Sequence, residues 1–255
     1  MTAAVGVGVT VLTGGGGGRP AAKDTTAATT ATRAAAPSPS APRSDDGGQT
    51  DNPRGAPDSV GVKSVIPGWK VVRGGERNVA FDVPPDWTVD AESMSIGFED
   101  DNGKPQEVMS SPAYYQHDWC DPGDSVGADR GAVGTKGAAG AGSLREAAET
   151  EAASWAYWAY QDKGKGTFSK AEDSRAFHND HGISGWQAQA TATGLPKADK
   201  CSPPGGIAYT VAWMDPSQRL PTPVVWVLYA DTGMNDQLAQ SVVDRIKSTI
   251  RPLKD

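Results

Sequence analysis

The chain has 255 residues and a net charge of −7 at pH 7, from 24 basic and 31 acidic side chains. Residues 1–62 contain five side chains of each sign, so the whole negative excess belongs to residues 63–255. An acidic domain without a basic stripe argues against nucleic acid as a partner and against an anionic membrane surface.

The N-terminal region differs in composition from the rest. Residues 1–12, MTAAVGVGVTVL, are apolar or small, but they are fewer than the roughly 20 that a membrane helix needs and they lack a basic start. We expect them to be the remnant of a membrane or signal segment. Residues 13–62 are rich in Ala, Pro, Thr and Gly, and Val60 and Val62 are their only large apolar residues. We therefore expect a disordered linker.

The folded part is expected to be one domain over residues 63–255, because all eight tryptophans lie between Trp69 and Trp226. The Ala/Pro/Thr-rich linker is typical of tethers that hold a domain away from a membrane. We expect an extracytoplasmic domain, either tethered through the N-terminal segment or secreted. The alternative is a cytoplasmic protein with a low-complexity N-terminus.

Short β-prone runs come first in this domain. Two of them flank a Gly-Gly turn and predict a hairpin, and the sequence PPDW then bends the chain. Two further runs flank an Asn-Gly turn signal and predict a second strand pair. The four runs are Gly68–Val72, Asn78–Val83, Ser93–Glu99 and Glu107–Tyr115. Residues 121–142 contain seven glycines, and we expect a long mobile loop there.

A helix is predicted after this loop. Ser143 and Glu146 have the spacing of a capping box, and an apolar stripe at helical spacing follows. Three strands and a fourth strand that is apolar on both faces come next, and an amphipathic helix stopped by Pro252 ends the domain. The stripe residues of the two helices are Leu144, Ala148, Ala152, Trp155 and Ala159, then Leu238, Val242, Ile246 and Ile250; the strands are 167–172, 185–194, 206–215 and 222–232. The fold class is therefore α+β, a mostly antiparallel sheet flanked by helices.

The chain has two cysteines, Cys120 and Cys201, and they do not form a Cys-x-x-Cys pair. In an exported chain two cysteines most simply form one disulfide. The alternative is a metal site in which both cysteines join His117 and one of His178 or His181. Zinc sites usually show at least one tight ligand pair, typically two cysteines with two to four residues between them, and here only His117 and Cys120 are close in sequence. We therefore favour the disulfide and expect neither metal nor cofactor.

The sequence SPAYYQHDWC is the candidate binding segment. It places Tyr114, Tyr115, His117 and Trp119 within six residues, beside Cys120 and the glycine-rich loop, which could act as a lid. Aromatic side chains with polar tips are favoured at recognition surfaces. The competing interpretation, which we favour, buries Tyr115 and Trp119 and leaves only Tyr114 and His117 exposed.

A catalytic function has little support in the sequence. GISGW at residues 182–186 is not a Gly-x-Ser-x-Gly motif, because Trp186 occupies the last position, and GKGT at 164–167 lacks the upstream glycine of a P-loop. The chain has only three histidines. His117 and Asp118 are adjacent, so on a strand their side chains would point apart. The alternative to a binding domain is an envelope enzyme that uses His117 and nearby carboxylates.

Several motifs resemble a known family. FDVPPDW at residues 81–87, YADTG at 229–233 and IKSTIRP at 246–252 are similar to domains with the Mog1/PsbP/LpqN-like α/β/α sandwich fold. ASWAYWAY and KCSPPGG resemble, more narrowly, an actinobacterial family of exported or membrane-anchored domains of unknown function. The resemblance covers about residues 66–253 and implies no catalytic residues.

These observations favour a non-catalytic extracytoplasmic binding or interaction domain of the actinobacterial cell envelope. The expected partner is an envelope protein or a small ligand, and the expected oligomeric state is a monomer. The membrane would be contacted only through the N-terminal segment.

Overall fold

The computed structural model describes residues 61–121, 128–215, 217 and 222–253. The N-terminal segment predicted at residues 1–12 lies outside the described residues. So does the linker predicted at 13–62, except for its last two residues. Within the described parts, no helix is long and apolar enough to cross a membrane. The elements, in chain order, are β1 (Lys70–Gly74), the 3-10 helix η1 (Gly75–Arg77), β2 (Val79–Val83), β3 (Thr88–Val89), β4 (Ser95–Glu99), β5 (Pro105–Tyr115), β6 (Gly131–Gly137), α1 (Leu144–Tyr160), β7 (Thr167–Phe168), β8 (Glu172–His178), β9 (Ser184–Thr193), β10 (Gly205–Met214), β11 (Pro223–Thr232), α2 (Gln240–Ser248) and β12 (Arg251–Pro252).

A nine-stranded sheet forms the centre of the domain. Its strand order is β3-β5-β6-β11-β10-β9-β7, with β4 paired to β5 and β8 paired to β9. Every strand pair is antiparallel. A second sheet has the order β1-β2-β12. The predicted mostly antiparallel α+β fold is thus confirmed, with two α-helices in the described residues.

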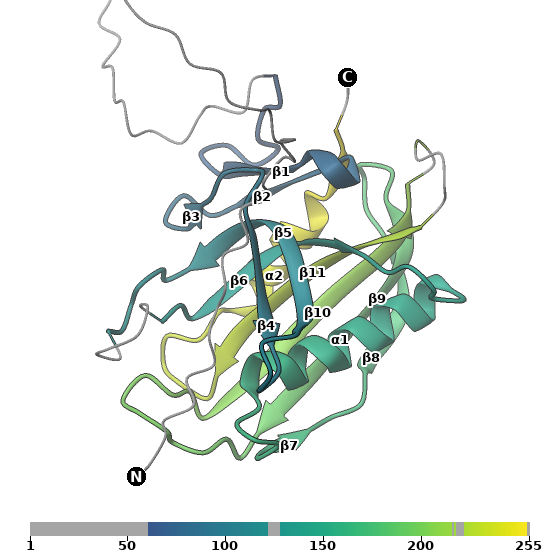
Figure 1. Ribbon diagram of the computed structural model, residues 1–255. Helices are drawn as coiled ribbons and strands as arrows, with labels where there is room; N and C mark the ends of the chain where they lie inside the picture. The colour runs from purple at the N-terminus through teal and green to yellow at the C-terminus, as the bar shows by residue number, and fades with distance from the viewer. Residues whose placement is uncertain (1–60, 122–127, 216, 218–221, 254–255) are drawn as a thin grey trace, which may run out of the picture. The chain divides into compact units, whose positions relative to one another are not determined.

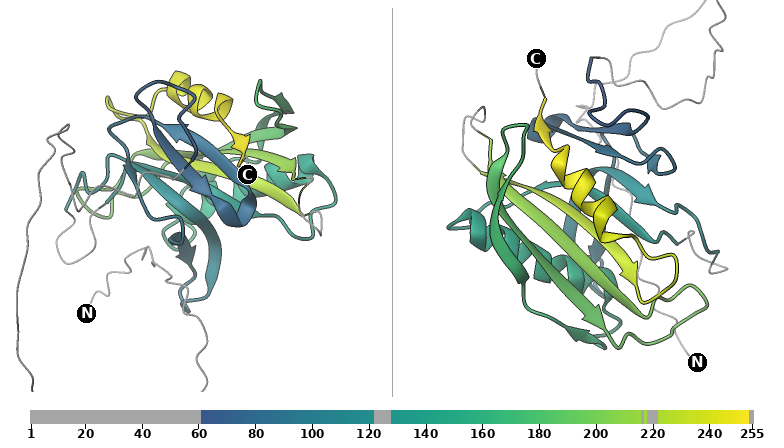
Figure 2. Two further views of the ribbon diagram at one scale, coloured as in Figure 1. Left: turned by 90° about the horizontal axis from the view of Figure 1, so that it is seen from above. Right: turned by 180° about the vertical axis from the view of Figure 1, so that it is seen from behind.

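The large sheet is covered on both faces. Figure 1 shows α1 on one face, and the rear view in Figure 2 shows α2 on the other. Strand β11 lies at the centre and is buried from Pro223 to Asp231. Its side chains alternate between the two cores: Val225, Val227 and Tyr229 pack with α1, and Val224, Trp226 and Leu228 pack with α2. The predicted strand that is apolar on both faces is therefore confirmed.

Helix α1 begins as its capping signal predicts. The Ser143 side chain accepts a hydrogen bond from the Glu146 backbone N–H, at 3.1 Å. The Glu146 carboxylate in turn accepts from the Gly142 N–H, one residue before the cap. The buried face consists mainly of alanines, which let the helix lie close to the sheet, and Trp155 is fully buried among them.

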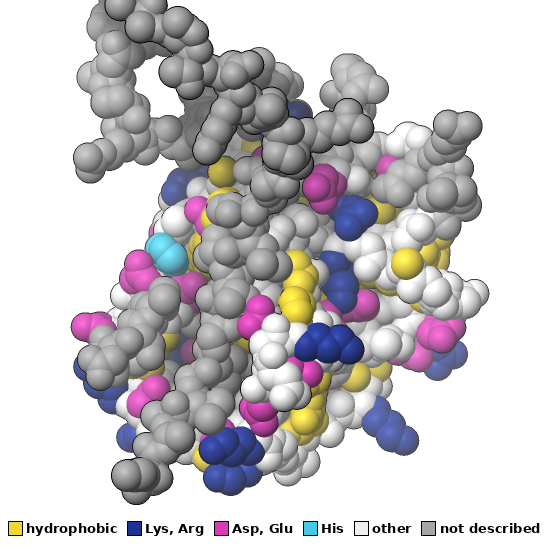
Figure 3. Space-filling view, in the orientation of Figure 1, with side chains coloured by type: hydrophobic (Ala, Val, Ile, Leu, Met, Phe, Trp, Pro, Cys, Tyr) yellow, Lys and Arg dark blue, Asp and Glu magenta, His cyan; other side chains and the backbone are white. Residues whose placement is uncertain are grey.

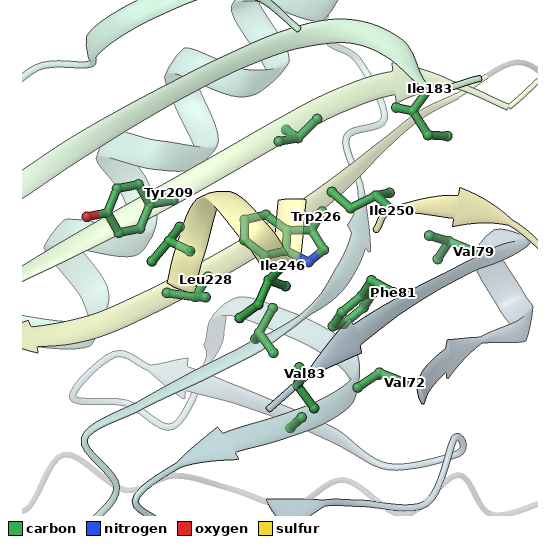
Figure 4. Packing of buried hydrophobic residues seen from close by; sticks show 14 of the residues in the cluster. Val72, Val79, Phe81, Val83, Ile183, Tyr209, Trp226, Leu228, Ile246 and Ile250 are labelled. Atoms are coloured by element: carbon green, nitrogen blue, oxygen red, sulfur yellow. The ribbon is translucent and has the colours of Figure 1, made fainter. Parts of the chain in front are cut away.

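The core on the opposite face is formed by α2 and the small sheet. Ile246 of α2 and Ile250 just after it pack with Phe81 of β2 and with Trp226, as Figure 4 shows. The helix ends at Ser248, before the predicted stop at Pro252. Residues 251–252 form β12 instead and pair with β2, so the end of the chain closes the small sheet.

The predicted mobile loop at 121–142 is wrong over residues 131–137, which form β6 between β5 and β11. The glycines of this segment allow neighbouring strands to pack closely and do not make the segment a flexible loop. A Cβ at Gly131 would lie 2.5 Å from the Tyr229 carbonyl oxygen, and one at Gly134 would lie 2.8 Å from that of Ser110. Glycine within a strand often marks such a close backbone approach. The predicted lid therefore loses its C-terminal part, and residues 122–127 lie outside the described residues.

Candidate functional site

The aromatic residues of the predicted binding segment are mostly engaged inside the domain. Tyr114 is 5% exposed, and its hydroxyl donates to Asp90 Oδ2 at 3.1 Å. Tyr115 is half-buried beside Trp87, and its hydroxyl donates to the Asp236 carbonyl oxygen at 2.8 Å. The expectation that Tyr114 is exposed and Tyr115 fully buried is wrong. The bulge before Ala113, where Ser111 has φ +55°, breaks the simple alternation along β5.

Trp119 is half-buried and supports a charged cluster. The Arg130 guanidinium lies over its ring, 3.5 Å from the ring centroid. Arg130 also pairs with Asp236 at 3.3 Å and with Asp231 at 3.7 Å. Burial raises the pKa of Asp231 to about 7, although the Arg130 charge opposes the shift. The ring of Trp119 thus covers a partly buried cation and is not a free recognition surface.

The predicted disulfide between Cys120 and Cys201 is present, with 5.8 Å between the two Cα atoms. It joins the segment after β5 to the segment before β10. Because both sulfurs are bonded to each other, the alternative metal site with both cysteines, His117 and one of His178 or His181 is wrong. Cys120 also forms a β-bridge with Ala128, which fixes the base of the loop between them.

His117 is the exposed member of the segment. Its Nδ1 lies 2.8 Å from Asp129 Oδ1, and its Nε2 lies 3.4 Å from Asp118 Oδ2. The residues are in a turn, with Asp118 at φ +53°, so the expectation that His117 and Asp118 point apart is wrong. The Tyr114 ring lies against the imidazole, with 4.8 Å between centroids and a tilt of 32° between the ring planes. Burial raises the pKa of the Asp129 carboxyl, against hydrogen bonds from Asp118 and His117 that lower it.

A second candidate site is a groove on the α2 face that sequence analysis did not predict. Its volume is about 220 Å³, and a neighbouring hollow of about 460 Å³ shares four of its residues. We name it the Lys247 groove. It is lined by Asp173, Arg175, Gln187, Ala188, Gln189, Tyr209, Gln240, Asp244 and Lys247.

Strand β8, strand β9 and α2 supply the charged and amide groups of this groove. Arg175 pairs directly opposite Gln187 in the β8–β9 register. Lys247 is 7% exposed, and its Nζ lies 2.8 Å from Asp244 Oδ1. Burial first, and then the Asp244 and Asp173 charges, raise the pKa of Tyr209 to about 12. The Tyr209 phenol therefore stays neutral at ordinary pH and donates to Gln240 at 2.7 Å.

The carboxamide of Gln187 lies between two cations and cannot serve both. With its oxygen toward Lys247, the distance to Nζ is 3.3 Å. In the opposite orientation the oxygen accepts from Arg175 Nε and Nη2, at 2.6 and 2.8 Å. Either orientation leaves one cation facing the amide NH₂ group, because an amide has a single acceptor atom. In both orientations Lys247 keeps its ion pair with Asp244 and Arg175 keeps its contacts with Asp173, and a ligand oxygen would add a further acceptor beside these cations.

One signal for this groove was visible in the sequence. Gln187 and Gln189 are polar residues two positions apart on a predicted strand, so they share a face. Arg175, which lies opposite Gln187, was not predictable in this way, because the strand predicted at 167–172 covers β7 and only the first residue of β8. The structure separates β7 from β8, and both pair with β9.

Comparison with known proteins places most of the chain in one family. A family model described as a domain of unknown function, DUF8017, matches residues 62–255. None of the curated proteins compared with the chain matches it. The match takes in every strand and helix from β1 onward, and the chain therefore belongs to the DUF8017 family.

Proposed function

We propose that this DUF8017 domain is a non-catalytic binding domain that acts outside the cytoplasm in the cell envelope of an actinobacterium. The observation that carries the binding function is the Lys247 groove, in which Arg175 and Lys247 compete for the single acceptor of Gln187. A small polar ligand with a carboxylate or phosphate group would supply that acceptor. Pairs of a cation with such an oxygen are among the stronger hydrogen bonds in proteins.

The location rests on different support. A disulfide is rare in reducing compartments and common in exported domains, and the Cys120–Cys201 pair encloses a long stretch of chain. The N-terminal segment would provide the tether or export signal and the only membrane contact. The resemblance of the sequence motifs supports a Mog1/PsbP/LpqN-like α/β/α sandwich, and the helices on opposite sheet faces agree with it.

A ligand of this kind fits the surface better than a polyanion does. Figure 3 shows basic and acidic side chains interspersed on the α1 face, which lies opposite the groove. Within the groove itself, Arg175 and Lys247 are balanced by Asp173 and Asp244. Such a mixture suits a small ligand with one acidic group, and we propose that the domain works as a monomer without nucleic acid.

The second candidate is an envelope enzyme that uses His117 with Asp118 and Asp129. The observation in its favour is that both carboxylates approach the imidazole. A covalent hydrolytic mechanism would also need a side-chain nucleophile beside the imidazole. Among the described residues, the hydrogen-bond and ion-pair partners of His117 are carboxylates, with neither hydroxyl nor thiol. Binding is therefore the better supported function.

The test is a titration of the ¹⁵N-labelled full chain with amino acids, sugar phosphates and N-acetylated amino sugar acids. We expect at least one class to shift backbone resonances of β8, β9 and α2. Arg175→Ala should abolish the shift, whereas Arg145→Ala on α1, an equally exposed arginine, should not. The proposal fails if no compound moves these resonances and the hydrolysis of envelope substrates depends on His117.

A further inference from the structure

We propose that His117 and Asp118 bind a divalent transition-metal cation of the zinc class, and that Asp129 positions the imidazole for it. This site is separate from the Lys247 groove and does not depend on the ligand proposed there. His117, Asp118 and Asp129 each offer a ligand atom, and these atoms lie within 4.8 Å of one another.

The first argument for a metal ion comes from the contacts of the two imidazole nitrogens. An ionised carboxylate can only accept hydrogen bonds, so the 2.8 Å contact with Asp129 requires a proton on Nδ1 of His117. In a neutral imidazole this leaves the lone pair on Nε2. Nε2 lies 3.4 Å from Asp118 Oδ2, so two hydrogen-bond acceptors lie close to each other. A positive charge between them, either a proton or a metal ion, is needed to make the contact favourable.

The second argument comes from the distance between His117 Nε2 and Asp118 Oδ2. Zinc binds imidazole nitrogen and carboxylate oxygen at about 2.0–2.2 Å. Two ligands at about 2.05 Å on a tetrahedral ion lie about 3.35 Å apart. The separation of 3.4 Å between His117 Nε2 and Asp118 Oδ2 has this value already. A metal ion would therefore fit between these two atoms with little movement of either side chain.

Asp129 has the position of an orienting residue. Metal-binding histidines usually donate their other N–H to a carboxylate or carbonyl, which fixes the tautomer and the ring. Asp129 accepts from the imidazole, and it also accepts from the Asp118 backbone N–H at 2.9 Å. It is anchored beside the Cys120–Ala128 bridge and its side chain is only 17% exposed. One carboxylate thus holds both of the proposed ligands in place.

Because His117 and Asp118 are exposed, the other ligands of the metal ion can come from outside the domain. The side chains of His117 and Asp118 are 39% and 59% exposed. The remaining coordination positions therefore face solvent and would take water or a donor atom from a partner. The mixed nitrogen and oxygen ligands favour zinc over calcium or magnesium, which prefer oxygen ligands alone.

The experiment titrates ZnCl₂ into the full chain, purified without a polyhistidine tag, by calorimetry and by ¹⁵N NMR of the imidazoles. We expect one saturable site per chain, a shift of Nε2 in His117 alone among the three histidines, and a retained proton on its Nδ1. MgCl₂ at the same concentration should leave these signals in place. His117→Ala should abolish the saturable binding, and Asp129→Asn should weaken it by about 10–100-fold.

Control variants distinguish the loss of a metal-binding side chain from a loss of folding. His181→Ala removes another histidine side chain whose contact with Asn179 is through its backbone N–H, so zinc binding should be unchanged. His117→Gln keeps a polar side chain, and thermal melts of every variant report folding. The proposal is overturned if zinc gives no saturable binding, or if His117→Ala binds zinc as tightly as the parent. The contacts of His117 with the two carboxylates would then account for the cluster without a metal ion.

Discussion

Asp231 should make the stability of the domain fall as the pH rises from mildly acidic to neutral values. The residue is 8% exposed at the end of β11, and burial raises the pKa of its carboxyl to about 7. The usual pKa of an unfolded Asp is about 3.9. Both states are protonated below about pH 4, so the contribution of Asp231 to stability is complete there.

The sign and size of the effect follow from these two pKa values. Between about pH 4 and pH 7 the unfolded chain releases the Asp231 proton while the folded chain keeps it, so the free energy of unfolding decreases. Above the folded pKa of about 7 the loss is complete. With about 1.4 kcal/mol per pKa unit, the loss between pH 5 and pH 8 is about 3 kcal/mol. In a domain of this size that is about 6–12 °C in Tm.

Asp231→Asn is the informative variant because it mimics the protonated acid. Arg130 keeps its second carboxylate partner, Asp236, at 3.3 Å. We expect the variant to melt close to the parent at pH 5 and about 6–12 °C above it at pH 8. The assay is thermal or urea unfolding over pH 4–9, with Asp101→Asn as the control for loss of one exposed negative charge. Parallel pH profiles of the parent and Asp231→Asn would refute the reasoning.

Three further results are expected. Protein unfolded without reductant should contain no reactive thiol, and two thiols per chain would contradict the disulfide. Reduction of Cys120–Cys201 should lower the free energy of unfolding by about 4–5 kcal/mol, as expected for a loop of this length. Gly134→Ala should lower the free energy of unfolding in urea by about 1–3 kcal/mol, because its Cβ would lie 2.8 Å from the Ser110 carbonyl oxygen. Gly137→Ala, whose Cβ would have its nearest neighbour at 3.5 Å, should change this free energy by less than about 0.5 kcal/mol. Limited proteolysis should leave a stable core that starts between about residues 55 and 68, and a resistant fragment that retains Thr30 would disprove the predicted domain boundary.

The elements predicted well are those whose signal lies within a few neighbouring residues. The cap at Ser143 and the stripe that ends near Tyr160 define α1 from contacts three and four positions apart. The unbroken apolar run of β11 requires burial on both faces and therefore a central place in the sheet. β6 was missed because its seven residues include three glycines, which have low strand propensity. The contacts that require those glycines come from β5 and β11, which are distant in the sequence.

The same physical limit separates what could be predicted of the candidate sites from what could not. His117 and Cys120 were identified as single residues, but Asp129, which fixes the imidazole, lies across the base of a loop. In the Lys247 groove, Arg175 meets Gln187 only because β8 returns beside β9, and Lys247 arrives from a helix 60 residues later. Each site consists of ordinary polar residues whose meaning depends on strand pairing. Patterns of period two or 3.6 predict which face a residue occupies, whereas the register of distant strands decides which charges meet there. For a domain built around an antiparallel sheet of long-range pairs, the strand register therefore decides which side chains meet at each candidate site. The most informative variants alter one side chain where distant strands meet and leave the strands themselves undisturbed.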